Sequence, residues 1–426
     1  MAKLAARGGT PVRTETFPEW PLAGPEEREW VEKVLSGSRW FGGLQGDDPG
    51  TMGRLFGERF AEFHGARFGM PVSNGSTAIE VALKALDIKP GDEVIVPAYT
   101  FISTATSVFM VGAVPVFADM DPQTYCLDPM DLERCLTPHT KAVLPVHLGG
   151  QMADMPAICD VAEKKGLRIL EDAAQAIDSV LEGKKSGTWG DLGTFSFQSN
   201  KTMTAGEGGL ILTNDPDIAE KVVALRAFGR FQDKPGVRSS DLTCTQVSSN
   251  YRLSELQAAV LMAQLERFPD HDALRQANAE RLNQGVEQIP GLKHIGLNRP
   301  HSKPNNKHGY YYYFLRYDTE QYGNINPDQF CEALQAEGIP FVPGDRKPLY
   351  RHPVFEVESL SDHLCPLALE RYQKALDLLG SGCPVTEEAC GCTILLRHQV
   401  LLGQEKDMDD ILEALWKVHK NIDELR

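Results

Sequence analysis

Long apolar runs are absent from this sequence of 426 residues. A membrane-spanning helix needs about 18 or more apolar residues in succession. The longest apolar region, residues 108–118, is interrupted by Gly112 and Pro115. The first residues also lack the apolar core of a secretion signal. We therefore expect a cytoplasmic protein that has no membrane partner.

Basic residues are scarce relative to acidic ones, with 43 Lys and Arg against 59 Asp and Glu and a formal net charge of −16. No long run of Lys or Arg occurs. A nucleic-acid surface needs clustered positive charge, so we expect no nucleic-acid partner. This composition remains compatible with a local basic pocket for a small anion.

Two kinds of motif are also missing. None of the nine cysteines forms a CxxC pair, and an odd count in a chain of this length argues against a disulfide scaffold. The nearest pair, Cys390 and Cys392, is interpreted as two ordinary thiols, and no metal site is predicted. No GxGxxG sequence follows the first strand, which argues against a dinucleotide-dependent oxidoreductase.

The chain does contain short apolar segments that alternate with amphipathic helices between residues 60 and 215. In the predicted helix Ser76–Ile88, apolar residues recur at helical spacing. Six segments are predicted strands: Glu93–Tyr99, Val114–Ala118, Lys141–His147, Arg168–Leu170, Gly193–Gln198 and Leu210–Thr213. This alternation predicts an α/β large domain whose mostly parallel sheet lies between helices.

After residue 215 the pattern changes. Ser254–Phe268 begins a long helix, and Gly309–Tyr317 is an aromatic-rich strand in which alternate tyrosines are expected to face core and solvent. The chain is long enough for two domains. We predict an N-terminal arm and large domain over residues 1–260, and a smaller C-terminal α+β domain over residues 261–426.

Two polar turns precede predicted helices. Asn74–Thr77 offers free backbone N–H groups at the positive end of a helix dipole, which suits a phosphate; a plain helix cap is the alternative. Ser249–Arg252 precedes the helix that Ser254 can cap. Its Asn and Arg side chains can reach a phosphate or a substrate, or can form an ordinary turn.

Aromatic and acidic residues follow two predicted strands, at the edge where open α/β sheets bind ligands. Phe101 can stack on a flat cofactor ring or pack in the core. Glu171 and Asp172 are adjacent acids that are costly to bury unless paired. An aspartate here can hold a pyridinium N–H and make the ring an electron sink; the alternatives are a metal or ribose ligand and a solvated turn.

Lys201 closely follows Ser196 at the end of another predicted strand. Burial lowers the pKa of a lysine and favours the neutral amine that forms a Schiff base; a surface lysine is the alternative. Residues 206–209 contain three glycines, which indicates an unusual backbone or a close approach to a ligand.

Together these segments resemble the DegT/DnrJ/EryC1/StrS family of sugar aminotransferases, which have the fold type I architecture and use pyridoxal 5′-phosphate (PLP). The matching strings are NGSTAIEVAL (74–83), GDEVIVPAYTFISTAT (91–106), TKAVLPVHLGGQMADM (140–155), EDAAQA (171–176), GTFSFQSNKTMTAGEGG (193–209) and NYRLSELQAA (250–259). The chain is similar to the branch with scyllo-inosose aminotransferases and 3-amino-5-hydroxybenzoate synthase. One departure is Ile177-Asp178, where the family often has a small pair.

The resemblance implies a role for each matching residue. Lys201 is the catalytic lysine that forms the Schiff base and moves the proton. Asp172 binds the pyridine nitrogen, Gln175 lies near the phenolic oxygen, and Phe101 stacks on the ring. The remaining cofactor-binding residues surround the phosphate: Gly75, Ser76, Thr77, Ser196 and, from the neighbouring subunit, Asn250. A homodimer with shared active sites is therefore implied.

The implied reaction is a ping-pong transfer of an amino group from L-glutamine or L-glutamate to a keto sugar or keto cyclitol. The second hypothesis for the function is a nucleotide-linked keto-sugar aminotransferase that uses glutamate as donor. A non-catalytic PLP-fold regulatory or binding protein is the third, and the presence of Lys201 and Asp172 argues against it. Five residues are candidates for substrate contact, each with a structural role as the alternative: His147, Tyr251, Arg252, His352 and His398.

Overall fold

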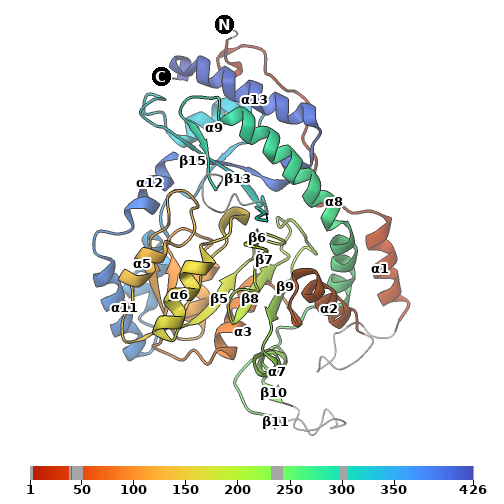
Figure 1. Ribbon diagram of the computed structural model, residues 1–426, viewed down its shortest axis with the longest axis vertical. Coiled ribbons are helices and arrows are strands. Elements are labelled where there is room, and N and C mark those ends of the chain that lie inside the picture. The colour runs from red at the N-terminus through yellow and green to blue at the C-terminus, as the bar shows by residue number, and fades with distance from the viewer. Residues whose placement is uncertain (1–2, 38–39, 41–50, 232–242, 297–304, 426) are drawn as a thin grey trace.

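The computed structural model describes residues 3–37, 40, 51–231, 243–296 and 305–425. Figure 1 shows a larger lower body and a smaller upper body, with the long helix α8 (Glu255–Val286) running between them. The large sheet lies in the lower body. Strands β13 (Tyr312–Tyr317) and β15 (Thr393–Arg397) lie in the upper body.

The large sheet has seven strands in the order β1-β9-β8-β5-β4-β2-β3. Their bounds are β1 (Phe68–Val72), β2 (Glu93–Pro97), β3 (Val114–Ala118), β4 (Thr140–Val143), β5 (Arg168–Asp172), β8 (Leu192–Ser196) and β9 (Gly209–Thr213). Only β9 runs antiparallel to its neighbours β1 and β8. The predicted α/β architecture with a mostly parallel sheet is confirmed.

Helices pack on this sheet and bury its apolar strands. These helices are α2 (Met52–His64), α3 (Gly75–Ala85), α4 (Ser103–Met110), α6 (Met155–Lys165), α7 (Pro216–Leu225) and α11 (Pro366–Leu379). Among them, α3 contacts β5, β8 and β9, and α6 contacts β5. The first turn of α3 therefore lies close to the ends of the central strands, where the cofactor residues were predicted.

Helix α11 comes from the C-terminal third of the chain but packs against β3. Its residues Ala368 and Tyr372 belong to the same buried cluster as Val94 and Val116 of the sheet. The predicted division at residue 260 falls inside α8 and stays a prediction. The packing shows that the C-terminal third contributes to both cores, which a single cut in the sequence does not describe.

The upper body is an α+β unit, as predicted. Its antiparallel sheet has the order β12-β13-β15-β14, with β12 at Leu292–His294 and β14 at Val342–Pro343. Helices α9 (Pro327–Ala336) and α13 (Glu405–Lys420) and the end of α8 share its apolar core. Leu4 packs in the same core, so the N-terminal arm is attached here.

The described residues form further α-helices and strands outside the two main sheets and the helices named above. They are α1 (Pro25–Leu35), α5 (Pro129–Arg134), α10 (Val357–Leu360), α12 (Pro384–Cys392), β6 (Val180–Leu181), β7 (Lys184–Lys185), β10 (Arg230–Phe231) and β11 (Thr243–Cys244). Helix α1 lies beside α8. Residues 41–50 of the predicted arm lie outside the described residues.

Four predicted strands are shorter in the structure than in the sequence pattern: β2, β4, β8 and β13. β4 ends at Val143, because Pro145 has no N–H to continue the ladder. Val146 pairs with Asp172 in an isolated β-bridge outside the strand. The strand expected from Gly309 begins at Tyr312. The expected core–solvent alternation there is wrong, because Tyr311 is 6% exposed and Tyr312 faces a cavity between the two bodies.

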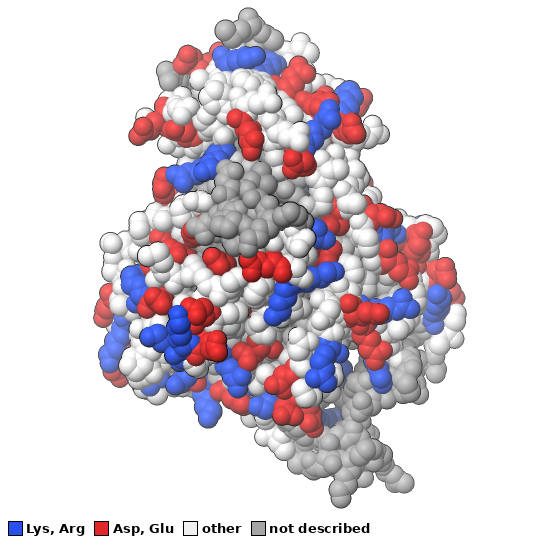
Figure 2. Space-filling view, viewed as in Figure 1, with Lys and Arg blue, Asp and Glu red and all other residues white. Residues whose placement is uncertain are grey.

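Charged side chains of both signs intermingle over the face shown in Figure 2. Within the described residues, no helix is long and apolar enough to cross a membrane.

Candidate active site

Lys201 lies in the loop after β8, where its backbone N–H donates to the carbonyl of Gln198 at 2.8 Å. Its side chain keeps some accessible surface, but its amine is surrounded by protein and lies 4.4 Å from the centre of the Tyr311 ring. Burial lowers the pKa of Lys201 to about 8, although the negative charge of Asp172 opposes the shift. A much larger share of this lysine is therefore neutral at physiological pH than of an exposed one.

Asp172 ends β5, which pairs in parallel with β8. Its Oδ2 accepts a 2.8 Å hydrogen bond from Thr104 Oγ1 on α4, and its Oδ1 accepts from the N–H of Ala174 at 3.1 Å. The side chain is buried. These two contacts fix a carboxylate at the carboxyl edge of the sheet, close enough to Lys201 for its charge to act on the amine.

The neighbouring Glu171 has a structural role. Its carboxylate is fully buried and accepts hydrogen bonds from the N–H groups of Gly187, Trp189 and Gly190 at 2.6–2.9 Å. It also accepts from Nε2 of His147 at 2.9 Å, while Nδ1 of His147 accepts from Ala153 N–H. Both ring nitrogens are thus in use and His147 has no exposed surface, so it braces the loop and does not contact a substrate.

The first turn of α3 forms a narrow cradle with β8. A Cβ added at Gly75 would fall 2.7 Å from Cβ of Ser196, so only glycine allows this approach. The side chains of Asn74 and Thr77 form the capping box of the helix, whereas Ser76 is exposed. The first-turn N–H groups have no partner within a helix, so they and Ser196 suit a phosphate. The Oγ1 atom of Thr77 forms its hydrogen bonds within the helix cap, which agrees with the alternative interpretation of Asn74–Thr77 as a plain cap.

Gln175 and Phe101 line one cavity of about 390 Å³ between the two bodies. Gln175 Oε1 accepts from the N–H of Gly149 at 2.7 Å, which orients its amide. Phe101 is 64% exposed, which favours a ring-stacking role over core packing. His352 lines the same cavity and so stays a candidate for substrate contact.

The side chains of the polar loop before α8, residues 249–252, make separate contacts with different parts of the protein. Asn250 is exposed, and its Oδ1 accepts from the N–H of Arg252 at 3.3 Å. Tyr251 donates its hydroxyl proton to Glu80 at 2.6 Å, which gives it a structural role. Nη1 of Arg252 is buried and has no hydrogen-bond partner among the described residues, and the guanidinium lies over the ring of Phe228. The structure does not bring this loop into the cavity lined by Phe101.

His398 lies behind the loop of Lys201. Its Nε2 is 3.0 Å from the carbonyl oxygen of Asn200 and donates to it, and its ring meets Trp20 edge-on at 4.7 Å. Burial, together with the charge of Arg275, lowers the pKa of His398 well below its ordinary value. A neutral, enclosed His398 supports the backbone next to Lys201 and is not placed to contact a substrate.

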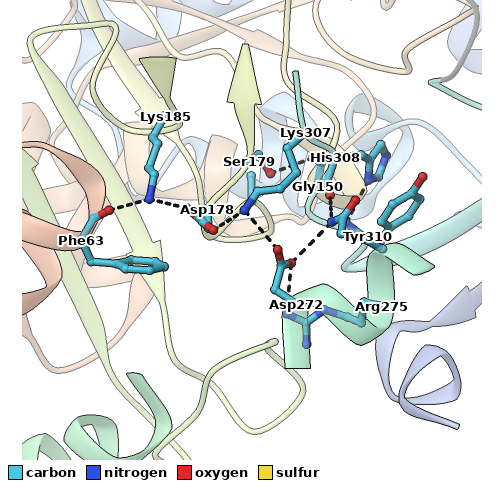
Figure 3. Close-up of polar contacts among 12 residues, drawn as sticks. Phe63, Gly150, Asp178, Ser179, Lys185, Asp272, Arg275, Lys307, His308 and Tyr310 are labelled. Atoms are coloured by element: carbon cyan, nitrogen blue, oxygen red, sulfur yellow. Dashed lines mark hydrogen bonds and ion pairs between the residues drawn. The ribbon is translucent and has the colours of Figure 1, made fainter. Parts of the chain in front are cut away.

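Asp178, one of the two residues at which the sequence departs from the family pattern, takes part in an ion-pair network (Figure 3). Asp178 pairs with Lys185 and Lys307, and Lys307 also pairs with Asp272 on α8 at 3.0 Å. Burial alone would raise the pKa of Asp178, but hydrogen bonds from the two lysines hold it below its ordinary value. The departure therefore fastens the loop after EDAAQA to α8.

Several cavity residues were not found from the sequence. The residues Asp345, Lys347, Tyr312 and Arg397 line the cavity from the upper body. Of these four residues, only Tyr312 belongs to a visible sequence pattern, the row Tyr310–Tyr313, and we interpreted that row as part of a strand. No local motif marks the others, because the packing of one body on the other brings them to the cavity.

A lysine with a lowered pKa, a braced aspartate and a glycine cradle at the carboxyl edge of this sheet define a PLP-dependent transferase. The residues fit the cofactor, since the cradle accommodates a phosphate and the carboxylate of Asp172 suits a pyridinium nitrogen. The chain belongs to the DegT/DnrJ/EryC1/StrS aminotransferase family, whose sequence profile matches residues 24–390.

Named relatives agree with this assignment. The chain is 39% identical to a putative L-glutamine:3-amino-2,3-dideoxy-scyllo-inosose aminotransferase of Streptoalloteichus tenebrarius, over 100% of both chains. It is 36% identical to L-glutamine:2-deoxy-scyllo-inosose aminotransferase of Micromonospora echinospora, again over 100% of both. Among solved structures, 3-amino-5-hydroxybenzoic acid synthase is similar, with a TM-score of 0.80, 29% identity and coverage of 95% of this chain and 99% of that one. The predicted family and enzyme class are confirmed.

Proposed function

We propose that this enzyme transfers the amino group of L-glutamine to a keto-cyclitol, with PLP as cofactor, in a homodimer. The observation that carries the proposal is the full-length similarity to enzymes named for this donor and for inosose acceptors. The cavity supports it, because polar groups from both bodies line a space that suits a small polyol. The similarity to these two enzymes favours a keto-cyclitol acceptor over a nucleotide-linked keto sugar.

Each site residue has a proposed task. PLP, when bound, supplies the electron-withdrawing ring that stabilises negative charge on the reacting carbon. Asp172, held by Thr104, orients toward the ring nitrogen and keeps its proton in place. Gln175 would lie beside the phenolic oxygen of bound PLP and Phe101 would cover one face of its ring, since both side chains line the cavity.

Lys201 acts as the general acid–base of the proposed reaction. Its lowered pKa makes the amine available to accept a proton from the α-carbon of the donor and to return it at the next step. Glu171 and His147 hold the surrounding loops, which limits the movement of the groups on either side. The same residues serve both halves of the reaction, since donor and acceptor occupy one cavity in turn.

The phosphate is assigned to the α3 cradle, through Gly75, Ser76 and Ser196, with Thr77 shaping the turn. Asn250 is assigned to the phosphate of the neighbouring subunit, which is consistent with its exposure. This assignment makes the dimer necessary for a complete site.

An absorbance scan of the purified enzyme tests the proposal. We expect a visible band that L-glutamine bleaches and that returns when a keto-cyclitol is added. Lys201→Ala should show no donor-dependent turnover. A protein that takes up no PLP, or that responds to L-glutamate but not to L-glutamine, would overturn the cofactor or the donor assignment respectively.

A further inference from the structure

The face of the Tyr311 ring lies against the amine of Lys201. Nζ of Lys201 lies over this ring, 4.4 Å from its centre, and Tyr311 is 6% exposed. Among the described residues, the amine of Lys201 forms no hydrogen bond and no ion pair. The electron-rich face of an aromatic ring attracts an ammonium group at such a distance, and it does so more strongly where water is excluded. This contact therefore favours the protonated form of the amine over the neutral form.

Tyr311 is held in this place at its backbone and at its hydroxyl. Its carbonyl oxygen accepts a 3.2 Å hydrogen bond from the N–H of His398, and Nε2 of His398 donates to the carbonyl of Asn200, the residue before Lys201. The hydroxyl of Tyr311 accepts from that of Tyr312 at 3.4 Å. His398 thus contacts both the segment that carries Tyr311 and the loop that carries Lys201, which fixes the ring and the amine relative to one another.

The groups around the amine act on its protonation in opposite directions. Burial lowers the pKa of Lys201 to about 8, and the negative charge of Asp172 at the end of β5 opposes that shift. His398, directly after β15, is neutral, because burial and the charge of Arg275 lower its pKa well below the ordinary value. The amine therefore has a carboxylate on the side of β5 and an uncharged imidazole behind its own loop.

The ring of Tyr311 is itself uncharged. Burial raises the pKa of its phenol, Tyr312 raises it further, and the charge of Arg397 at the end of β15 lowers it. The phenol stays protonated at physiological pH because burial is the largest of these effects. Tyr311 thus favours the ammonium form of Lys201 through the face of its ring and does not bring a second negative charge to the amine.

We propose that Tyr311 is a positioning residue for proton transfer, whose ring face holds the Lys201 ammonium between its acceptance and its return of the proton. The inference rests on the proposed role of Lys201 as the general acid–base and adds a group that stabilises its acid form. The neutral amine takes the proton from the α-carbon of the donor and becomes an ammonium, which then gives the proton up and is neutral again. The attraction of a ring is weaker than that of a buried carboxylate partner, so it stabilises the ammonium without preventing this return.

The uptake of PLP by the cofactor-free protein tests this contact, because its pH dependence reports the neutral, reactive form of the Lys201 amine. Tyr311→Phe keeps the ring and removes the hydroxyl, so the midpoint should stay within about 0.3 of wild type. Phenylalanine rings that carry one, two or three fluorine atoms at this position nearly keep that shape but draw electrons away from the ring face. We expect the midpoint to fall with each fluorine, by about 0.4 to 1.5 in total, the worth of one lost cation–π contact.

The same fluorinated rings in place of Phe330 are the matched control. Phe330 is fully buried on α9 in the upper body, where it packs against Tyr317 and Tyr322, so this series should leave the midpoint unchanged. A midpoint that stays constant through the Tyr311 series, or that falls equally in the Phe330 series, would overturn the inference while leaving the proposed function intact. If wild-type protein takes up no PLP, or its visible band does not respond to L-glutamine, the proposed function itself fails.

The half-reaction with L-glutamine gives a second readout. At saturating donor, the rate at which the visible band is lost should fall about two- to tenfold between the unfluorinated and the trifluorinated ring at Tyr311, because the ammonium formed by the first proton transfer is less stable. The donor concentration that gives half of the maximal rate should stay within about twofold, since Tyr311 has no part in holding the donor. A series that raises this concentration and leaves the maximal rate unchanged would show that the ring serves binding instead, which would also overturn the inference.

Discussion

Thr104 Oγ1 donates a 2.8 Å hydrogen bond to Oδ2 of Asp172, and this contact joins α4 to the carboxyl end of β5. Both groups are buried, so water cannot replace the hydroxyl if it is removed. The position of the carboxylate that we propose for the pyridine nitrogen of PLP thus depends on a hydroxyl group from a different element, α4.

Thr104→Val should therefore weaken the hold on the cofactor without removing any group that touches it. We expect the dissociation constant of PLP to rise about tenfold, the worth of one buried hydrogen bond to a charged group. The visible band should also shift, because the carboxylate sets the electronic state of the ring. Thr106→Val is the control, since that hydroxyl on the same helix donates to the carbonyl of Ile102 and not to Asp172. Equal effects of the two substitutions would contradict the role of Thr104.

The reactivity of Lys201 should follow a titration near its lowered pKa of about 8. The neutral amine is the reactive form, so cofactor-free protein should take up PLP faster as pH rises between about 7 and 9.5. Asp172→Asn removes the charge that opposes the shift, so the midpoint should move to lower pH. Asp377→Asn, on the exposed side of α11, should leave it unchanged. A midpoint near the ordinary value of 10.5 would show that the amine is not buried in this way.

The lowered pKa of Lys201 also determines how the stability of the folded protein changes with pH. Its pKa is lower in the folded than in the unfolded state, so the unfolded chain binds more protons between about pH 8 and 10.5. The cofactor-free protein should gain stability from this group as pH rises through that window. Lys201→Met should lose that part of the pH dependence, which thermal unfolding measures.

Glu171 should be among the most sensitive positions for stability. Its carboxylate accepts four hydrogen bonds and is fully buried. Glu171→Gln keeps the shape but turns one acceptor into a donor that faces N–H groups. We expect a loss of about 2–4 kcal/mol in the free energy of unfolding, against less than about 0.5 kcal/mol for Glu163→Gln on the exposed face of α6. Denaturant unfolding of both variants measures the difference.

The Asp178 network predicts an acid-dependent contribution to stability. Hydrogen bonds from Lys185 and Lys307 hold the pKa of Asp178 below 3.8, so its contribution is present at neutral pH and is lost as pH falls through the folded-state pKa. Asp178→Asn should cost about 2–3 kcal/mol at pH 7, and the gap to wild type should narrow in acid. Asp160→Asn, which breaks only the exposed pair with Lys164, should cost far less. A gap that stays constant with pH would contradict this account.

The sequence predicted the parts of the site that single strands and their loops define. Asp172 ends a strand, and Gln175 and Phe101 follow one within a few residues, so the strand pattern alone predicted that these residues lie near the carboxyl edge of the sheet. The same reasoning failed for His147, where a polar residue after a strand proved to be a buried brace. Strand pattern shows that a side chain is near the edge, but only packing shows whether it faces the cavity.

The remaining residues depend on contacts between distant segments. Asp345 and Arg397 reach the cavity because the antiparallel upper sheet packs over the lower one. Helix α11 covers β3 although about 250 residues separate them, and its amphipathic pattern carries no sign of which sheet it covers. Residue spacing determines local structure, whereas these placements follow from how apolar faces pair across the whole chain.

A mixing experiment tests whether the active site is shared across the dimer. Lys201→Ala removes the amine from a subunit's own site, and Asn250→Ala removes the proposed phosphate contact to the neighbouring site. In a hybrid dimer with one variant chain of each kind, one site carries both changes and the other carries neither. Random mixing should therefore restore about a quarter of wild-type activity, since half of the dimers are hybrids with one intact site each.

If Asn250 instead serves its own subunit, every site in the hybrid carries one change, and mixing restores nothing. The assay is run at a PLP concentration that leaves Asn250→Ala largely without cofactor, so that its own activity is low. A mixture of Lys201→Ala with Asn421→Ala, whose amide donates only to the carbonyl of Lys417 in the upper body, shows how much activity an unrelated change leaves. Two chains of 47.0 kDa give the mass that light scattering should find for the active species. A monomer of full activity would exclude the shared site, because no second chain would be present to supply Asn250.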